Sequence, residues 1–436
     1  MADFLVNSQA QQTAMLKEIG KDWESLFAAI PKDLRLSGLN LASGQSEMSA
    51  RWLMQDYAEQ NRIFKTCFLG AGSYRHFIPA IVDSIANREE FLTAYTPYQP
   101  EMSQGILQSI FEYQTMICQL TGHDASNASV YDGASACAEA VNMCRSGNRK
   151  KMLIASTINP QYRATIKTYF QFNDIEIVEI PETAGVIEEE TLRKHLDDNT
   201  MGVILQSPNY YGIFEDSLTL GEIIHEAGAT FVLCANPLSF ALSASAGELG
   251  ADICVGDAQP FGMNLAYGGP YLGYMTCTKD YMRKLPGRIV GQTTDRNGKT
   301  AYVLTLQARE QHIRREKATS SICSNQANCA LRCAIFLATV GPDGLREMAR
   351  QSYQKAHLLA EKLCDLPGFS LKYDKPFFNE FVVESSTETK AISEKLAENG
   401  ILAALSLNAN EMLWCATECN TPEEIAKVYE LLKEVV

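Results

Sequence analysis

The sequence lacks an excess of basic residues. Its 436 residues include 52 acidic and 38 basic ones, which give a net charge of -14 at pH 7. Such a chain is repelled by phosphate backbones and anionic membrane surfaces, so we expect neither nucleic acid nor a membrane as a partner. The stretch from Met1 to Lys17 also lacks a basic segment followed by an apolar run. We therefore expect no secretory signal and a cytoplasmic location.

No C-x-x-C motif occurs among the 13 cysteines. The pairs Cys329/Cys333 and Cys415/Cys419 have the i, i+4 spacing of a helix face, and no histidine is near them in the sequence. No metal site is predicted from such pairs. An odd number of cysteines without a secretory signal predicts buried, reduced thiols rather than disulfides.

Nucleotide-binding motifs are incomplete. Gly70-Ala71-Gly72 begins like a dinucleotide fingerprint, but Arg75 replaces its third glycine. Gly298-Lys299-Thr300 ends like a phosphate-binding loop, but Thr293 replaces its first glycine, so we interpret the segment as a polar surface turn. A nicotinamide site and a nucleoside triphosphate site are both disfavoured.

The stretch Ala227–Gly247 carries no charge and is long enough to cross a bilayer. Asn236, Pro237 and three serines interrupt it. A buried strand followed by a loop and a turn of small residues is the expected structure.

The order of apolar and polar runs indicates three regions. Residues 1–61 have a polar helical pattern and are expected to form an N-terminal helical arm. Residues 62–320 alternate helical patterns with strand-like runs, which favours a mostly parallel sheet with helices on both faces. The runs are Lys151–Ala155, Ile175–Ile180, Val203–Gln206, Phe231–Cys234 and Ile253–Val255. Residues 321–436 predict a connecting helix and a small C-terminal α/β domain.

A turn of small residues opens a predicted helix from Ser135 to Cys144. Free N–H groups and the helix dipole make such a turn, Gly133-Ala134-Ser135, a possible anion site. A helix start capped by Asp132 would look the same without a ligand, so both interpretations stay open.

Several blocks resemble the glycine cleavage system P-protein family. The segment Thr93–Gly105, which reads Thr-Ala-Tyr-Thr-Pro-Tyr-Gln-Pro-Glu-Met-Ser-Gln-Gly, is similar to the signature segment of that family. Further blocks that agree in order are Phe68–Tyr74, Gln114–Gly122, Gln206–Asn209, Gly268–Gly273 and Arg309–Ser320. The resemblance covers most of the chain.

The resemblance implies a type I pyridoxal-phosphate-enzyme (aspartate aminotransferase-like) fold, with a mostly parallel sheet and a smaller C-terminal α/β domain. Family members occur as one chain of two similar halves or as two subunits. The blocks Gln259–Gly262 and Arg309–Ser320 resemble the amino-terminal half, which is subunit 1 when separate.

A pyridoxal enzyme needs a lysine for the Schiff base and an acid facing the pyridine nitrogen. In the family's competent half, both follow strand ends. The corresponding elements here are Cys234-Ala235-Asn236 and Asp257–Gly262, and no lysine occurs between Lys194 and Lys279. We therefore expect no covalently bound cofactor on this chain. Asp257 could be a displaced pyridine partner, although a turn-forming role is favoured.

The resemblance implies that pyridoxal phosphate is held covalently by a lysine-bearing subunit 2. Together the subunits would decarboxylate glycine and pass the aminomethyl group to the lipoyl arm of H-protein. We hypothesise that residues of the signature segment line the shared pocket or interface, and that three residues of other family-like blocks do so too. The expected residues are Tyr95, Thr96, Pro97, Tyr98, Gln99, Glu101, Ser103 and Gln104, with His76, Arg309 and His312.

Each of these assignments has a structural alternative. The segment could be a Pro-rich turn at an interface, and His312 with its basic neighbours could be a solvated helix face. Two other functions also stay open for the whole chain: a non-catalytic assembly or regulatory subunit, and an autonomous pyridoxal enzyme that uses an unforeseen lysine.

Overall fold

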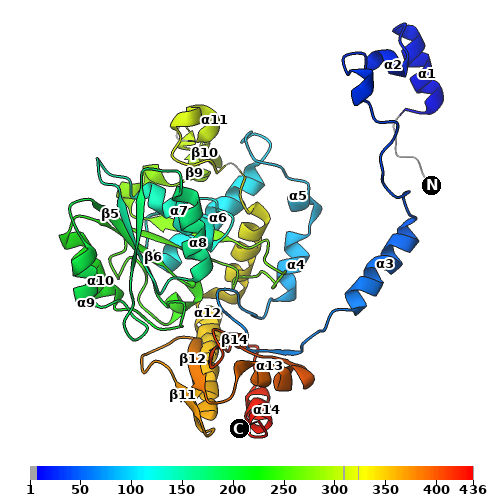
Figure 1. Ribbon diagram of the computed structural model, residues 1–436. Helices are drawn as coiled ribbons and strands as arrows, with labels where there is room; N and C mark the ends of the chain where they lie inside the picture. Colours follow the sequence, from blue (N-terminus) through cyan, green and yellow to red (C-terminus); the bar gives the residue numbers. More distant parts are fainter. Residues whose placement is uncertain (1–6, 308–309, 323, 436) are drawn as a thin grey trace. The chain divides into compact units, whose positions relative to one another are not determined.

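The computed structural model describes residues 7–307, 310–322 and 324–435. The chain divides into two compact units, Met1–Ile63 and Phe64–Val436 (Figure 1). Each unit is described separately below.

The N-terminal unit consists of short helices that bury none of their side chains. Its elements are α1 (Gln9–Glu18), α2 (Trp23–Leu26), a 3-10 helix (Lys32–Leu34) and α3 (Glu47–Glu59). Ser8 and Asp22 cap the first two helices through reciprocal bonds with the third helical residue, which explains why these helices begin there. Large apolar side chains stay exposed within the described part of the unit, Trp23 at 54% and Trp52 at 59%.

A seven-stranded sheet lies at the centre of the larger unit, in the order β2-β8-β7-β6-β5-β3-β4. Its strands are β2 (Ala125–Ser126), β3 (Lys151–Ala155), β4 (Glu176–Ile180), β5 (Thr200–Gln206), β6 (Thr230–Cys234), β7 (Ile253–Asp257) and β8 (Gly273–Cys277). The pairs from β7 to β4 are parallel, and β8 pairs antiparallel with β7 and β2. All five predicted strand runs are confirmed.

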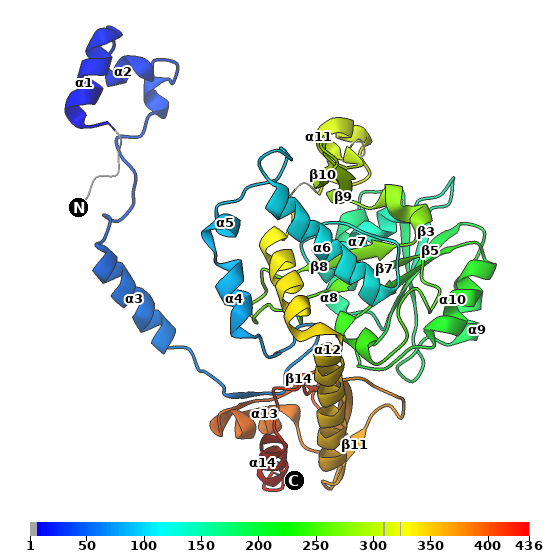
Figure 2. The same cartoon turned by 180° about the vertical axis from the view of Figure 1, so that it is seen from behind.

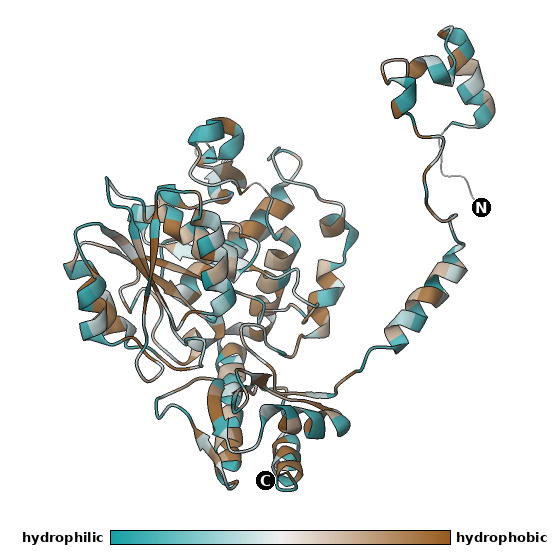
Figure 3. Ribbon diagram, viewed as in Figure 1, coloured by the Kyte–Doolittle hydropathy of each residue, from teal (hydrophilic) through white to brown (hydrophobic). Residues whose placement is uncertain are grey.

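Helices cover the sheet on both sides, as the opposite views in Figures 1 and 2 show. They are α6 (Gln104–Thr121), α7 (Gly133–Met143), α8 (Pro160–Phe170), α9 (Glu189–His195) and α10 (Ser217–Glu226). Further out lie α4 (Ala80–Ala86), which packs on α12 (Ala327–Cys364), and α5 (Glu89–Leu92). Apart from the edge strand β4, which is partly exposed, the strands are buried and apolar, which Figure 3 shows as brown ribbons inside the unit. Burial on both faces explains why their sequences are continuous apolar runs rather than alternating ones.

Short elements follow the sheet strands. The 3-10 helices Pro237–Ala241 and Lys279–Lys284 follow β6 and β8, and α11 (Gln311–Arg314) continues into the 3-10 helix Arg315–Lys317. A hairpin of β9 (Ile289–Thr294) and β10 (Thr300–Thr305) packs on α6. A separate apolar cluster that includes Leu107 of α6, Val290 and Leu304 joins hairpin and helix.

Helix α12 (Ala327–Cys364) connects the sheet domain to the C-terminal domain. Its backbone leaves helical geometry at Gly341, directly before Pro342, since a proline disfavours the helical conformation in the preceding residue. The first part contacts α4 and α6, and the helix also contacts β11, β12 and α14.

The C-terminal domain has its own core, in which Trp414 is fully buried. Its elements are β11 (Phe369–Leu371), β12 (Glu380–Ser385), α13 (Thr389–Glu398), β13 (Ile401–Leu402), β14 (Leu405–Ser406), β15 (Glu411–Cys415) and α14 (Pro422–Leu432). Strand β1 (Thr66–Cys67) pairs with β13, and Phe68 belongs to this core. Residues 66–68 thus pack with the C-terminal domain, although we expected them in the large domain that begins at residue 62.

Two further expectations concern the membrane stretch and the cysteine pairs. No helix among the described residues is long and apolar enough to span a membrane. Cys329 and Cys333 lie on the helix α12, whereas Cys415 ends β15 and Cys419 lies in the following turn, so the same spacing corresponds to a helix only in the first pair.

Candidate functional site

The ends of β6 and β7 lie beside the start of α7, where an α/β fold of this kind binds its ligand. Here the carboxylate of Asp257, the last residue of β7, fills that position. Its Oδ2 accepts a hydrogen bond from Gly133 N at 3.1 Å, and its Oδ1 accepts from Gln259 N at 2.9 Å and from Leu272 N at 3.3 Å. Burial nevertheless raises the pKa of Asp257 to about 6.

A second donor at this helix start is also engaged. Ser135 N donates to Asp132 Oδ1 at 2.8 Å, which confirms Asp132 as the N-cap. The Tyr162 hydroxyl lies so close to Gly133 that a Cβ there would be 2.4 Å from it. Gly133, Ala134 and Ser135 are all buried. The chain's own carboxylates therefore supply the anions at this turn, and binding of an external anion there stays a prediction.

The remaining space at the strand ends is about 30 Å³, in a cavity lined by Tyr74, Tyr162, Asn236 and Glu380, among others. Glu380 is buried and accepts hydrogen bonds from Ala71 N at 2.6 Å and from Tyr74 Oη at 2.7 Å. Burial raises the pKa of Glu380 to about 7. A cofactor site needs roughly 300 Å³ or more. The residues at the strand ends of this chain do not fit pyridoxal phosphate.

The signature segment Thr93–Gly105, in contrast, lies largely at the surface. Tyr95 is 88% exposed and Tyr98 48% exposed, and Gln99 and Glu101 are also exposed. Thr96 and Ser103 are half-buried, and Pro97 is buried. Exposed apolar side chains that lie together typically mark interaction sites. A turn that served only to pack the protein would bury more of its aromatic surface than this segment does.

Ala94–Pro97 line a cavity of about 360 Å³ together with α6, the start of α12 and Arg288. Arg288 lies directly before β9 and is only 6% exposed. Its Nη2 donates to Tyr98 Oη at 3.1 Å, and its guanidinium lies 5.4 Å from the centre of the Tyr98 ring. Tyr98 thereby connects the exposed segment to a buried positive charge.

Gln104 has a structural position at the start of α6. Its Nε2 donates to Tyr302 O at 2.8 Å and to Pro100 O at 2.8 Å, and its Oε1 accepts from Tyr302 N at 2.9 Å. This pair of bonds to one residue of β10 fixes the hairpin against the end of the signature segment.

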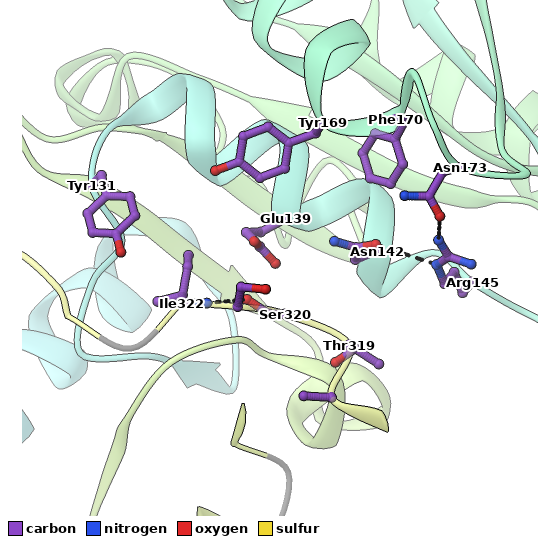
Figure 4. Close-up of a pocket in the computed structure, with 12 residues that line it drawn as sticks. Tyr131, Glu139, Asn142, Arg145, Tyr169, Phe170, Asn173, Thr319, Ser320 and Ile322 are labelled. Atoms are coloured by element: carbon purple, nitrogen blue, oxygen red, sulfur yellow. Dashed lines mark hydrogen bonds between the residues drawn. The ribbon is translucent and has the colours of Figure 1, made fainter. Parts of the chain in front are cut away.

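A second cavity, of about 540 Å³, lies between α7, α8 and residues 318–322. Figure 4 shows Glu139 of α7 in its wall, with Tyr131, Tyr169 and Ser320 around it. Glu139 is 3% exposed, and within residues 7–307, 310–322 and 324–435 its Oε2 has no hydrogen-bond partner. Burial raises the pKa of Glu139 to about 7. The described residues contain no group of side chains that could hold a metal ion.

Comparison with known proteins is consistent over nearly the whole length. The family model described as Glycine cleavage system P-protein matches residues 2–432. The chain belongs to this family. A probable glycine dehydrogenase (decarboxylating) subunit 1 of Desulfitobacterium hafniense is 47% identical over 99% of this chain and 100% of its own. A protein of Moorella thermoacetica with the same name is 44% identical over 99% of both chains.

Solved structures agree with the P-protein assignment. A crystal structure of glycine decarboxylase (P-protein) of the glycine cleavage system, in inhibitor-bound form, matches with a TM-score of 0.94 and 39% identity, and covers 100% of both chains. Glutamate decarboxylase of Lactobacillus brevis matches with a TM-score of 0.70 at 14% identity, over 94% of this chain and 97% of its own. The predicted type I pyridoxal-enzyme fold is confirmed.

Within this P-protein fold, the predicted site residues separate into groups. The signature segment gathers around Tyr98 and Arg288, and the half-exposed His312 ring lies 6.4 Å from the Tyr98 ring, edge-on. His76 is instead buried against the C-terminal domain, where its Nδ1 is 2.7 Å from Glu418 Oε2. Arg309 lies outside the described residues.

Arg288 was not predicted from the sequence. It stands as a lone arginine in the run Gly287-Arg288-Ile289-Val290, where no spacing or motif marks it. A charged residue inside an apolar run was the available signal, because such a residue is seldom buried unless it has a partner.

Proposed function

We propose that this chain is a subunit of the glycine cleavage system P-protein that acts with a lysine-bearing subunit 2. The complex decarboxylates glycine and transfers the aminomethyl group to the lipoyl arm of H-protein. Pyridoxal phosphate is held covalently by subunit 2, where it supplies the electron sink for decarboxylation. This chain lacks the Schiff-base lysine and completes the shared site.

One contrast between two parts of the chain carries the proposal. The strand ends that hold the cofactor in this fold leave about 30 Å³, and the helix start beside them is bonded to Asp257. The signature segment instead opens a cavity of about 360 Å³ at the surface. This chain fills its own cofactor position with side chains and exposes its family-specific residues. Its chemical role is therefore at an interface with another chain.

The exposed residues of the signature segment have distinct roles at that interface. Tyr95 packs against the partner through its ring, and Tyr98 contributes a hydroxyl that is held by Arg288. Glu101 contributes a carboxylate, while Ser103 and Gln99 contribute neutral polar groups. Gln104 holds the segment against β10, so it positions these groups rather than contacting substrate.

Glycine-dependent carbon dioxide exchange tests the proposal. The reaction would be measured with H-protein and pyridoxal phosphate for this chain alone, for subunit 2 alone and for the mixture. We expect exchange only in the mixture. Exchange by this chain alone would show an autonomous enzyme, and full exchange by subunit 2 alone would show that this chain has no catalytic part.

A further inference from the structure

The guanidinium of Arg288 is a buried charge that has no counter-ion among the described residues. Within the part of the chain that the structure describes, it forms no ion pair, and its one side-chain hydrogen bond goes to the neutral hydroxyl of Tyr98. Its Nε is fully buried and has no acceptor. Arginine stays protonated in proteins, so a full positive charge is present at this point.

An uncompensated buried charge is costly, because the protein interior replaces its hydration poorly. The ring of Tyr98, 5.4 Å from the guanidinium, offsets only part of that cost. The half-buried Arg332 offers a contrast, because its side chain, which is 14% exposed, lies 2.6 Å from the Asp83 carboxylate. Since the described residues bring no carboxylate to Arg288, we infer that its anion comes from outside the chain.

The surroundings of Arg288 favour a small carboxylate as that anion. The cavity of about 360 Å³ has an apolar wall that includes Ile106, Ile110 and Leu331. Its polar groups are neutral hydroxyls and amides, among them Ser109, Asn325 and Asn328. A planar guanidinium matches a carboxylate with two parallel hydrogen bonds, and the neutral groups do not compete for its charge.

We propose that Arg288 binds the carboxylate of the amino-acid substrate. This inference rests on the proposed function, because it places the substrate carboxylate of the shared site on this chain. Tyr98 holds the guanidinium from the segment side, and the backbone of Arg288 is held by Ala128, whose N–H donates to Arg288 O at 2.8 Å.

Two variants of Arg288 test the site in the assembled complex. Arg288→Met removes the charge and is expected to raise the KM for glycine about 10- to 100-fold, as the loss of charged hydrogen bonds does, with a smaller change in kcat. Arg288→Lys keeps the charge without the planar fork and is expected to fall between the two. Arg283→Met, an exposed arginine five residues earlier, is the matched control and should leave the KM unchanged.

A second measurement uses the isolated chain and acetate as the probe. Broadening of the acetate methyl signal in proton NMR, at constant ionic strength, reports carboxylate binding without subunit 2. We expect broadening with the parent chain and with Arg283→Met, and none with Arg288→Met. This measurement separates the two proposals, because acetate binding by the isolated chain does not require an active complex.

The outcomes are decisive for the site. An unchanged KM for Arg288→Met in a complex of normal assembly would overturn the proposal. Weaker assembly with an unchanged KM would also overturn it, because Arg288 would then pair with an acid of the partner. If the mixed parent subunits show no exchange activity but acetate binds through Arg288, the proposed function fails while the carboxylate site remains.

Discussion

Tyr98 shows how one side chain connects a surface segment to a buried charge. Its hydroxyl accepts the one side-chain hydrogen bond that the Arg288 guanidinium donates within the described structure. We expect Tyr98→Phe to raise the KM for glycine by about 3- to 10-fold, since a hydrogen bond of this kind contributes about 1 kcal/mol. The measurement is steady-state exchange in the mixed complex, with Tyr353→Phe on α12 as the control. An unchanged KM would show that the hydroxyl has no part in the site.

Glu139 predicts a pH dependence of stability. Its pKa is raised from 4.5 to about 7 by burial, so the folded chain keeps a proton that the unfolded chain has released between those values. The free energy of unfolding must then fall as the pH rises through this window, by up to about 3 kcal/mol for a shift of this size. Glu139→Gln cannot release a proton and should reduce the slope, while Asp257 and Glu380, whose pKa values burial also raises, keep their contributions.

Urea unfolding at several pH values between 5 and 8, a range of about three units around the raised pKa, measures this slope. Glu176→Gln, at an exposed position of β4, controls for the loss of one charge. If Glu139→Gln and the parent chain lose stability in parallel as the pH rises, the carboxyl of Glu139 is not the group responsible.

At the scale of elements, Gln104 joins α6 to β10. Gln104→Ala removes both bonds to Tyr302 and leaves an amide and a carbonyl of β10 without these partners, which costs about 1–3 kcal/mol. We expect faster hydrogen exchange in β9 and β10 with little change in the central sheet. Gln108→Ala, one turn later on α6, loses only an exposed bond to Glu112 and is the matched control. Equal exchange in the two variants would contradict this role of Gln104.

The central elements could be predicted because their sequences satisfy a single requirement. Four of the five strand runs are buried on both faces, so burial alone determines them, whereas the run of the edge strand β4 alternates glutamate with apolar residues. The start of α7 was predictable from Asp132 as a cap. The hairpin of β9 and β10 was not predicted as strands, because its residues from Gln292 to Thr300 are polar and indicate only a turn.

The candidate site was only partly predictable, since it depends on contacts between distant segments. The signature segment was marked by resemblance, but its exposure depends on how α5, α6 and the hairpin pack. Arg288 is separated from Tyr98 by 190 positions, and no local pattern connects the two. His76 looked equivalent to His312 in sequence, yet Glu418 holds it at the C-terminal domain.

At the scale of the molecule, the N-terminal unit stands out because its described residues form no buried core of their own. None of its described side chains is buried, and its helices expose two tryptophans. We expect trypsin to cut the isolated chain first at Lys21 or Arg51, before it cuts the sheet domain, because segments without buried contacts open at low free energy. Mixing with subunit 2 should slow these cuts by about 10-fold or more if the apolar side chains become covered. Equal rates with and without subunit 2 would show that the unit stays exposed in the complex.

The central claim is that this chain completes a site whose cofactor is held by another chain. Borohydride reduction of the mixed subunits with pyridoxal phosphate, followed by mass spectrometry of each separated chain, tests it most directly. The account predicts one pyridoxyl group on subunit 2 and none on this chain, whose strand ends leave about 30 Å³ and carry no lysine between Lys194 and Lys279. A stoichiometric pyridoxyl group on this chain would contradict the account.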